Sequence, residues 1–128
     1  ERGLDKNALT LMDFNVPQQG HTQFMYILPF SQNEALFELT RFGSEKITID
    51  QAREILEEYI AKHFGDFEIN ETEKGVIPMF MDLPKPAHQK NVLSIGTRAS
   101  KVKPSTGYAF KNMFAHAQSI SAQKKRSF

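Results

Sequence analysis

The chain has 128 residues, and its 16 Lys and Arg nearly balance its 15 Asp and Glu, which gives a net charge of +1. A chain of this length buries a single hydrophobic core, and its charge provides no general attraction to nucleic acid. The absence of Cys excludes disulfides, iron–sulfur clusters, thiolate zinc sites and cysteine nucleophiles. Because no apolar run approaches the roughly 20 residues of a membrane span and no signal peptide is present, we expect a cytoplasmic location.

Composition along the chain predicts three parts. The polar opening lacks hydrophobic periodicity, so residues 1–10 are expected to form a flexible leader. Residues 11–123 are predicted to form a single α+β domain. Residues 124–128 are a basic tail with the cluster Lys124, Lys125 and Arg126. Since the sequence begins at Glu1 and not at Met, we expect a fragment of a longer protein.

Two apolar, aromatic-rich segments, 23–30 and 35–42, are separated by a short polar turn and predict an antiparallel hairpin. A strand's period of two assigns the residues of the second segment to two faces. One face receives Leu36, Glu38, Thr40 and Phe42, and the other receives Ala35, Phe37, Leu39 and Arg41. Aromatic and Met residues at this density are more typical of a core than of a ligand surface, although a long apolar substrate would need a similar wall.

Apolar residues at helical spacing predict a helix over residues 48–64. Thr48 and Gln51 have the spacing of a capping box, Asp50 is an alternative cap, and Gly65 supplies the stop. Beyond it, residues 66–72 alternate polar and apolar, as in a half-buried strand.

The rest of the chain predicts shorter elements. Pro78 makes residues 76–80 an edge strand or an irregular segment, and the prolines of 82–90 predict a loop. Residues 91–96 are expected to form a short buried strand, and residues 106–123 a last helix. Together these elements predict an α+β fold with a mixed, largely antiparallel sheet of five or six strands and two main helices.

Glu38 is the first candidate for chemistry because it stands in the middle of an aromatic strand. The simpler interpretation is an exposed carboxylate on the solvent face of a half-buried strand. The functional interpretation places Glu38 in an apolar pocket, where loss of water contact favours the neutral acid and allows proton donation near neutral pH. Periodicity alone does not decide between them.

The loop from Gly96 to Tyr108 is the second candidate, since Pro104, Thr106 and Gly107 come just before a predicted helix. Backbone N–H groups and a helix dipole there would favour an anion such as a phosphate or a reduced flavin ring. A simple capped loop is the alternative interpretation. The four His residues share no ligand spacing, so we expect no metal site.

Six short motifs, taken in order, carry a resemblance to a known family. They are residues 12–14 (MDF), 24–30 (FMYILPF), 36–40 (LFELT), 75–78 (GVIP), 91–96 (NVLSIG) and 104–108 (PSTGY). Over about residues 10–120 this set resembles the lycopene cyclase family of carotenoid biosynthesis. The resemblance implies a flavoprotein about three times as long, of which this chain would be the central, substrate-side segment. An N-terminal dinucleotide-binding domain with a Gly-rich fingerprint would then be the missing partner, since none is present here.

The resemblance also implies roles for single residues. Glu38 matches the first Glu of the family's strand motif, which is the proposed catalytic acid, and Thr40 matches its closing Thr. Leu39 replaces a second acidic residue, which argues against a two-carboxylate mechanism. The implied substrate contacts are Tyr26, Phe37, Thr40 and Tyr108, and the implied flavin contacts are Gly96, Pro104, Thr106 and Gly107. Thr97 stands where related flavoenzymes usually have Asp.

The implied reaction is an acid-initiated, redox-neutral ring closure at the end of lycopene, an apolar polyene. The implied cofactor is reduced FAD with NAD(P)H as reductant in the full-length protein, and none is expected in this segment, which is expected to be inactive alone. Association of the full-length protein with the inner membrane surface and a homodimer of the segment stay open. The alternative functions are a flavin-dependent reductase or hydroxylase, and a non-catalytic module that binds an apolar ligand or a protein partner.

Overall fold

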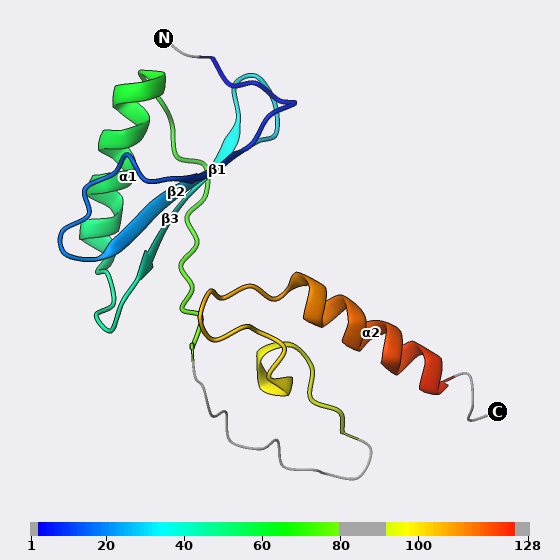
Figure 1. Ribbon diagram of the computed structural model, residues 1–128. Helices are drawn as coiled ribbons and strands as arrows, with labels where there is room; N and C mark the ends of the chain where they lie inside the picture. The colour runs from blue at the N-terminus through cyan, green and yellow to red at the C-terminus, as the bar shows by residue number, and fades with distance from the viewer. Residues whose placement is uncertain (1–2, 80–91, 125–128) are drawn as a thin grey trace. The chain divides into compact units, whose positions relative to one another are not determined.

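The computed structural model describes residues 3–79 and 92–124. The chain divides into two compact units, Glu1–Thr72 and Glu73–Phe128. The first unit contains a three-stranded antiparallel sheet in the order β1-β2-β3 and one long helix, α1 (Figure 1). The strands are β1 (Thr10–Asp13), β2 (Thr22–Pro29) and β3 (Ala35–Phe42). These elements, with a second helix in the other unit, confirm the predicted α+β class.

Strands β2 and β3 form the predicted hairpin with an unbroken register from Thr22↔Phe42 to Pro29↔Ala35. The turn closes through the Phe30 N–H, which donates to the Glu34 carbonyl at 2.8 Å. Because paired residues of an antiparallel ladder share a face, the pair Met25↔Leu39 lies on one face and Tyr26↔Glu38 on the other. The predicted division of residues 35–42 between two faces is therefore confirmed.

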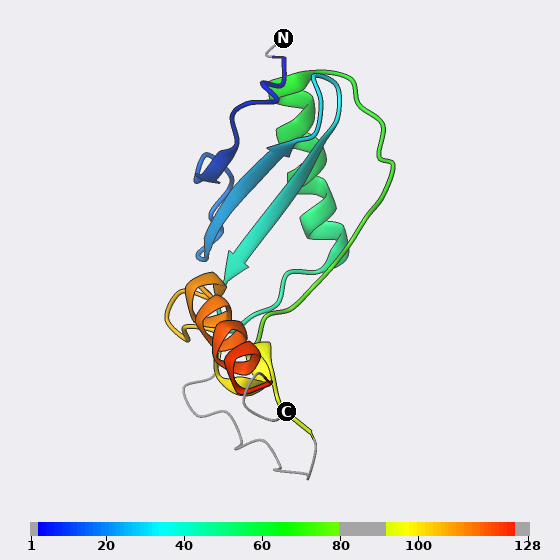
Figure 2. The same ribbon diagram turned by 90° about the vertical axis from the view of Figure 1, so that its right-hand side faces the viewer.

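Helix α1 (Ile49–Phe64) begins one residue after the predicted start and covers one face of the hairpin (Figure 2). Its capping box is present: the Thr48 hydroxyl accepts from the Gln51 N–H, and the Gln51 side chain accepts from the Thr48 N–H, both at 3.2 Å. The helix ends at Gly65, whose φ of 85° suits a residue without Cβ.

The hydrophobic core lies between α1 and the covered face of the sheet. Its buried members are Val16, Met25, Ile27, Ile55 and Tyr59. Phe37 and Leu39 of β3 and Phe64 of α1 pack around them. Each fully buried side chain of this size contributes about 1.5–3 kcal/mol, so this interface holds the helix to the sheet. Leu4 also packs against this core from within the expected leader.

The covered face ends in a polar network around Gln23, which is fully buried. The Gln23 side-chain amide donates to the Pro17 carbonyl, and its oxygen accepts from Arg41 Nε at 2.6 Å. The Gln18 side chain pairs with both backbone groups of Gln23, at 3.1 and 2.8 Å. These bonds compensate the lost hydration of Gln23 and fix the loop that enters β2.

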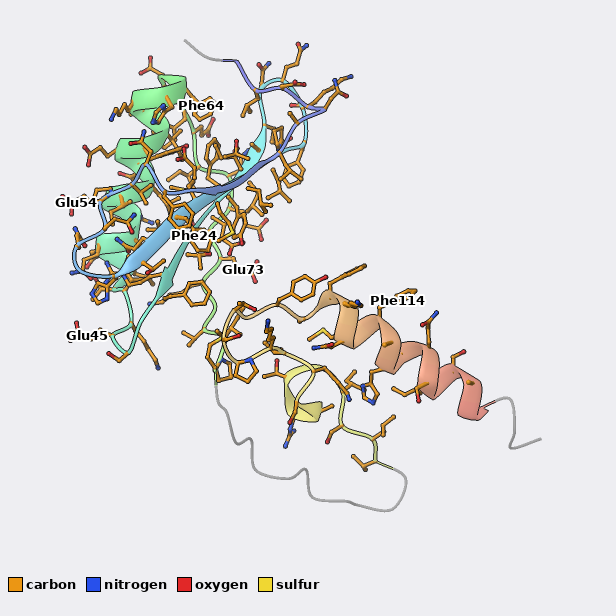
Figure 3. All side chains as sticks on the ribbon, in the orientation of Figure 1. Phe24, Glu45, Glu54, Phe64, Glu73 and Phe114 are labelled. Carbon is orange, nitrogen blue, oxygen red and sulfur yellow. The ribbon has the colours of Figure 1, made fainter. Side chains whose placement is uncertain are left out.

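The second unit contains a 3₁₀ turn, η1 (Gly96–Ala99), and helix α2 (Phe110–Lys124). Helix α2 presents exposed apolar side chains, among them Phe110 and Phe114, whose rings stack at a centroid distance of 6.2 Å (Figure 3). Its first turn contains no acidic residue.

Several predicted elements are wrong. Within the described residues the sheet has three strands, not five or six, and residues 66–72 form none, whereas residues 76–79 are irregular, which was one of the two alternatives predicted for them. Residues 66–72 alternate polar and apolar, but their apolar side chains Phe67 and Ile69 are exposed, so the segment has no surface to pack on among the described residues. Val92, Leu93 and Ile95 are also exposed, not a buried strand. The last helix begins at Phe110 and not at 106, because residues 103–108 close a turn first. Loop 82–90, Phe80, Asn91 and residues 125–128 lie outside the described residues.

Candidate functional site

The face of the sheet opposite α1 carries Glu38. Its β2 residues are Thr22, Phe24, Tyr26 and Leu28, and their partners on β3 are Phe42, Thr40, Glu38 and Leu36. We call this surface the open face. Apart from Glu38 and the hydroxyls of two Thr and one Tyr, every side chain on it is a hydrocarbon. Leu28 and Leu36 are 39% and 44% exposed, so the described residues leave apolar area uncovered here.

An aromatic cluster occupies one half of the open face and is centred on Phe24. The Phe24 ring lies 5.1 Å from Tyr26, 5.9 Å from Phe42 and 5.4 Å from Phe14, measured between ring centroids. The contacts with Tyr26 and Phe14 are edge-to-face, a favoured geometry for aromatic pairs. Phe24 is only 2% exposed although no helix covers it, because its aromatic neighbours enclose it. The cluster is thus a preformed aromatic wall.

Glu38 lies directly opposite Tyr26 and next to this wall. Its carboxylate is exposed, and Oε1 accepts a hydrogen bond from the Thr40 hydroxyl at 2.9 Å. Both side chains point to the same face because they are two residues apart on one strand. The bond fixes the orientation of the carboxyl group and leaves its second oxygen, Oε2, for a proton. The described residues provide no second wall above Glu38.

Of the two other predicted substrate contacts, one lies on the opposite face of the sheet and one belongs to the second unit. Phe37 is on the covered face, where its ring packs edge-to-face on Phe64 of α1 at 5.3 Å, so it lies on the other side of the sheet from Glu38. Tyr108 belongs to the second unit and is 53% exposed. The structure therefore brings Tyr26 and Thr40 together with Glu38, and it does not bring Phe37 to that face.

The predicted flavin contacts lie in one loop of the second unit. Gly96 and Gly107 have φ values of 60° and 70°, which L side chains rarely adopt. A Cβ on Gly107 would contact Met79, and one on Gly96 would contact Met113. The N–H groups of Thr106 and Gly107 both donate to the Lys103 carbonyl, at 3.2 and 2.9 Å. The turn thus uses these two donors itself, and they are not available to an anion in this conformation.

Charge is strongly segregated along the chain, a feature that the near-zero total conceals. Residues 83–128 carry nine Lys and Arg and no Asp or Glu, whereas residues 1–82 carry the other seven and all 15 acidic residues. Within the described part, Arg98, Lys101, Lys103 and Lys111 lie in or next to the Gly96–Tyr108 loop. This loop therefore has the electrostatic character that an anionic ligand requires.

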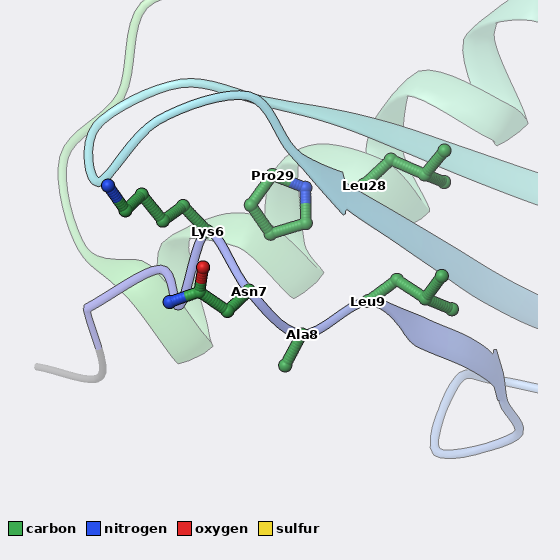
Figure 4. Close-up of a pocket in the computed structure, with 6 residues that line it drawn as sticks. All are labelled: Lys6, Asn7, Ala8, Leu9, Leu28 and Pro29. Carbon is green, nitrogen blue, oxygen red and sulfur yellow. The ribbon is translucent and has the colours of Figure 1, made fainter.

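Two shallow cavities border the first unit's sheet. One, of about 220 Å³, lies at the end of the hairpin beside Leu28 and is lined by Lys6, Asn7, Ala8, Leu9 and Pro29 (Figure 4). The other, of about 270 Å³, lies between the segment Phe14–Pro17 and α1. Neither contains Glu38, so the candidate site is a surface and not an enclosed pocket among these residues.

Sequence reasoning missed the part of the site that precedes β2. Phe14 joins the aromatic wall, and the residue before it, Asp13, accepts a hydrogen bond from the Tyr59 hydroxyl at 2.6 Å. These partners are 46 positions apart, so no local pattern relates them. The MDF motif drew attention to the segment but not to its contacts.

Comparison with known proteins identifies the family. The family model described as "Lycopene cyclase protein" matches residues 2–127, which is nearly the whole chain. The chain therefore belongs to the lycopene cyclase family, and this membership supports a lycopene cyclase-like enzyme of carotenoid biosynthesis. No curated protein and no solved structure matches it significantly.

The described residues contain neither a helix that could span a membrane nor a cluster of metal-ligand side chains. None of the helices in this part of the chain is long and apolar enough to cross a membrane. The same residues, 3–79 and 92–124, contain no group of three or more His, Cys, Asp and Glu side chains that could hold a metal ion.

Proposed function

We propose that this segment supplies the proton donor and one wall of the site in which a lycopene cyclase closes the end-group ring of lycopene. The observation that carries the proposal is the place of Glu38. It is the one acidic residue among the paired residues of the open face, and it lies opposite Tyr26 beside the aromatic wall. The family match supports the same reaction class independently.

In the proposed mechanism, the neutral carboxyl group of Glu38 donates its proton from Oε2 to the terminal C=C bond of the polyene. The tertiary carbocation that results is attacked by the next C=C bond, which closes the ring. Loss of a proton from a carbon next to the new cationic centre restores a C=C bond. One proton is gained and one is lost, so the product is an isomer of the substrate and no oxidant or reductant is consumed.

The residues around Glu38 have distinct tasks in this scheme. The Thr40 hydroxyl donates a hydrogen bond to Oε1 of Glu38, so that the acidic O–H on Oε2 keeps one direction. The face of the Tyr26 ring, which the buried Phe24 ring supports from the side, would stabilise positive charge without reacting with it, by about 0.5–2 kcal/mol. Once the rest of the enzyme covers it, the apolar surface would also exclude water, which would otherwise capture the cation.

Reduced FAD is the proposed cofactor, and the loop residues fit the group in charge and backbone shape. The positive φ of Gly96 and Gly107 and the lack of Asp and Glu in residues 83–128 suit an anionic ligand. We propose that Gly96, Pro104, Thr106 and Gly107 hold it, with the Thr106 and Gly107 N–H groups released from Lys103. When bound, the reduced flavin would supply negative charge that stabilises the carbocation. A dinucleotide-binding domain would hold the remainder of the cofactor.

The test replaces Glu38 in the complete gene, expressed in lycopene-accumulating cells whose pigments are then analysed. Glu38→Gln keeps the shape and loses the transferable proton, so lycopene should persist without cyclic product. Glu34→Gln is the matched control, because Glu34 lies in the turn of the same hairpin and outside the open face. Cyclic pigment at the normal level from Glu38→Gln would remove Glu38 from the mechanism and favour a non-catalytic, ligand-binding role for the open face.

A further inference from the structure

A hydrogen bond joins α1 to Asp13, the last residue of β1. The Tyr59 hydroxyl donates to Asp13 Oδ2 at 2.6 Å, a length typical of a hydroxyl bound to a carboxylate. Tyr59 is only 7% exposed, and its ring also packs on His63 at 4.5 Å. The bond is therefore partly shielded from water, which strengthens such an interaction.

Asp13 uses its other oxygen locally. Oδ1 accepts from the N–H of Asn15 at 2.9 Å, which closes a turn of the type that Asp side chains stabilise. Phe14 is the residue inside this turn. Both oxygens of one carboxylate thus act on Phe14: one shapes the backbone around it, and the other ties that backbone to α1.

Phe14 connects this turn to the candidate site through ring contacts. Its ring packs edge-to-face on Phe24, which packs edge-to-face on Tyr26, the direct partner of Glu38. Phe24 is a strand residue between two paired neighbours, but Phe14 lies outside the strands and is 51% exposed. The placement of the Phe14 ring therefore depends on its turn more than on surrounding side chains.

We infer that Asp13 and Tyr59 are positioning residues that hold Phe14 against Phe24 and so keep water from the aromatic wall beside Glu38. The inference rests on the proposed function of the open face. If the turn loosens, the edge of the Phe24 ring becomes accessible to water. Water that reaches the first carbocation adds to it through oxygen and then loses a proton. The product is a tertiary alcohol, because the water has reacted before the next C=C bond could close the ring.

The first test needs no activity and uses the 128-residue chain. Nuclear Overhauser contacts between the Phe14 and Phe24 ring protons are expected in the unsubstituted protein. Tyr59→Phe removes one oxygen atom and keeps the ring in the core, and we expect these contacts to be lost or strongly weakened. Tyr108→Phe, the same change in the other unit, should leave them intact. Undiminished Phe14–Phe24 contacts in folded Tyr59→Phe would overturn the inference.

Two substitutions of Asp13, one conservative and one not, test the same hydrogen bond from its other end. Asp13→Asn retains one oxygen that can accept from the Asn15 N–H, and its amide NH₂ can donate to the Tyr59 hydroxyl, so the ring contacts should be largely preserved, whereas Asp13→Ala should lose them. Tyr59→Phe and Asp13→Ala both remove the same hydrogen bond between Tyr59 and Asp13. Tyr59→Phe combined with Asp13→Ala should therefore be no worse than Asp13→Ala alone. Additive losses would mean that the two residues act separately.

The second test uses the complete gene in lycopene-accumulating cells. Misplaced groups in a site commonly lower rates by about 10- to 100-fold, and we expect a decrease of that size in cyclic pigment from Tyr59→Phe, with hydroxylated product appearing. Lower cyclic pigment with unchanged product identity would indicate a merely structural role. Normal cyclisation by Glu38→Gln would refute the proposed function while leaving the ring-contact result unaffected, so the two failures are distinguishable.

Discussion

The two faces of one hairpin differ completely in how they are used. On the covered face, Met25 and Ile27 are buried beneath α1, and even the polar Gln23 has partners for its side-chain oxygen and nitrogen. On the open face, an equally apolar set of residues surrounds one carboxylate, and Leu28 and Leu36 stay 39% and 44% exposed. The comparison teaches that the buried side chains of the covered face provide most of the stability of the fold, whereas on the open face only Phe24 is fully enclosed and the residues around Glu38 stay accessible to a ligand.

The largest expected effect on stability lies on the covered face. Met25 is fully buried between the sheet and α1, so Met25→Ala should lower the free energy of unfolding by about 2–5 kcal/mol. Urea unfolding followed by circular dichroism measures the change. Leu36→Ala, on the open face of the same hairpin, is the control and should cost less than about 1 kcal/mol. Equal losses would contradict the division of roles between the faces.

Next in size is the loss of the Gln23 network. Gln23→Ala leaves the Pro17 carbonyl and the Nε of Arg41 without their partner, and unsatisfied groups of this kind cost about 1–3 kcal/mol. The same unfolding measurement applies. Gln32→Ala, in the exposed turn of the hairpin, should change the unfolding free energy by less than about 0.5 kcal/mol. A Gln23 variant as stable as the Gln32 variant would show that the network contributes nothing.

A smaller effect is expected at the start of the covering helix. Thr48→Ala removes the hydroxyl that accepts from the Gln51 N–H and should cost about 1 kcal/mol. Thr48→Ser keeps that hydroxyl and should restore most of the loss. Hydrogen exchange of the first-turn amides of α1 would locate the effect. If Thr48→Ala and Thr48→Ser exchange alike, the capping box is unimportant.

The smallest expected effect on stability belongs to the open face. Leu28→Ser replaces a 39%-exposed side chain, so the unfolding free energy should change by less than about 1 kcal/mol, while binding of a hydrophobic dye should fall. Self-association of the chain, if it occurs through this face, should fall as well. A large stability loss with unchanged dye binding would show that Leu28 belongs to the core.

The hairpin and α1 were predictable because their patterns are long and local: eight-residue strands of alternating faces and a 16-residue helix with its cap. Strand β1 was not, since it has four residues, an irregular register and Met12 at a positive φ of 57°. Residues 66–72 show the opposite error, in which alternation is present but no strand pairs with them in the described part.

The candidate site, like the fold, was predictable only in part. Alternation placed Glu38 and Thr40 on one face and Phe37 on the other, but it did not reveal which face α1 covers. That choice depends on the packing of Phe37 and Leu39 against a helix that follows in the chain. The bond between Asp13 and Tyr59 depends on the same packing. Long-range contacts of this kind decide the site, and no local pattern in one sequence encodes them.

The most direct measurement of the central claim is solvent-proton incorporation by the complete enzyme. Lycopene is converted in D₂O, and the deuterium content of the cyclic product is counted by mass spectrometry. A carboxyl proton exchanges with solvent, so donation from Glu38 predicts one deuterium atom for each ring formed and none in recovered lycopene. Cyclic product without deuterium would contradict acid-initiated ring closure on the open face.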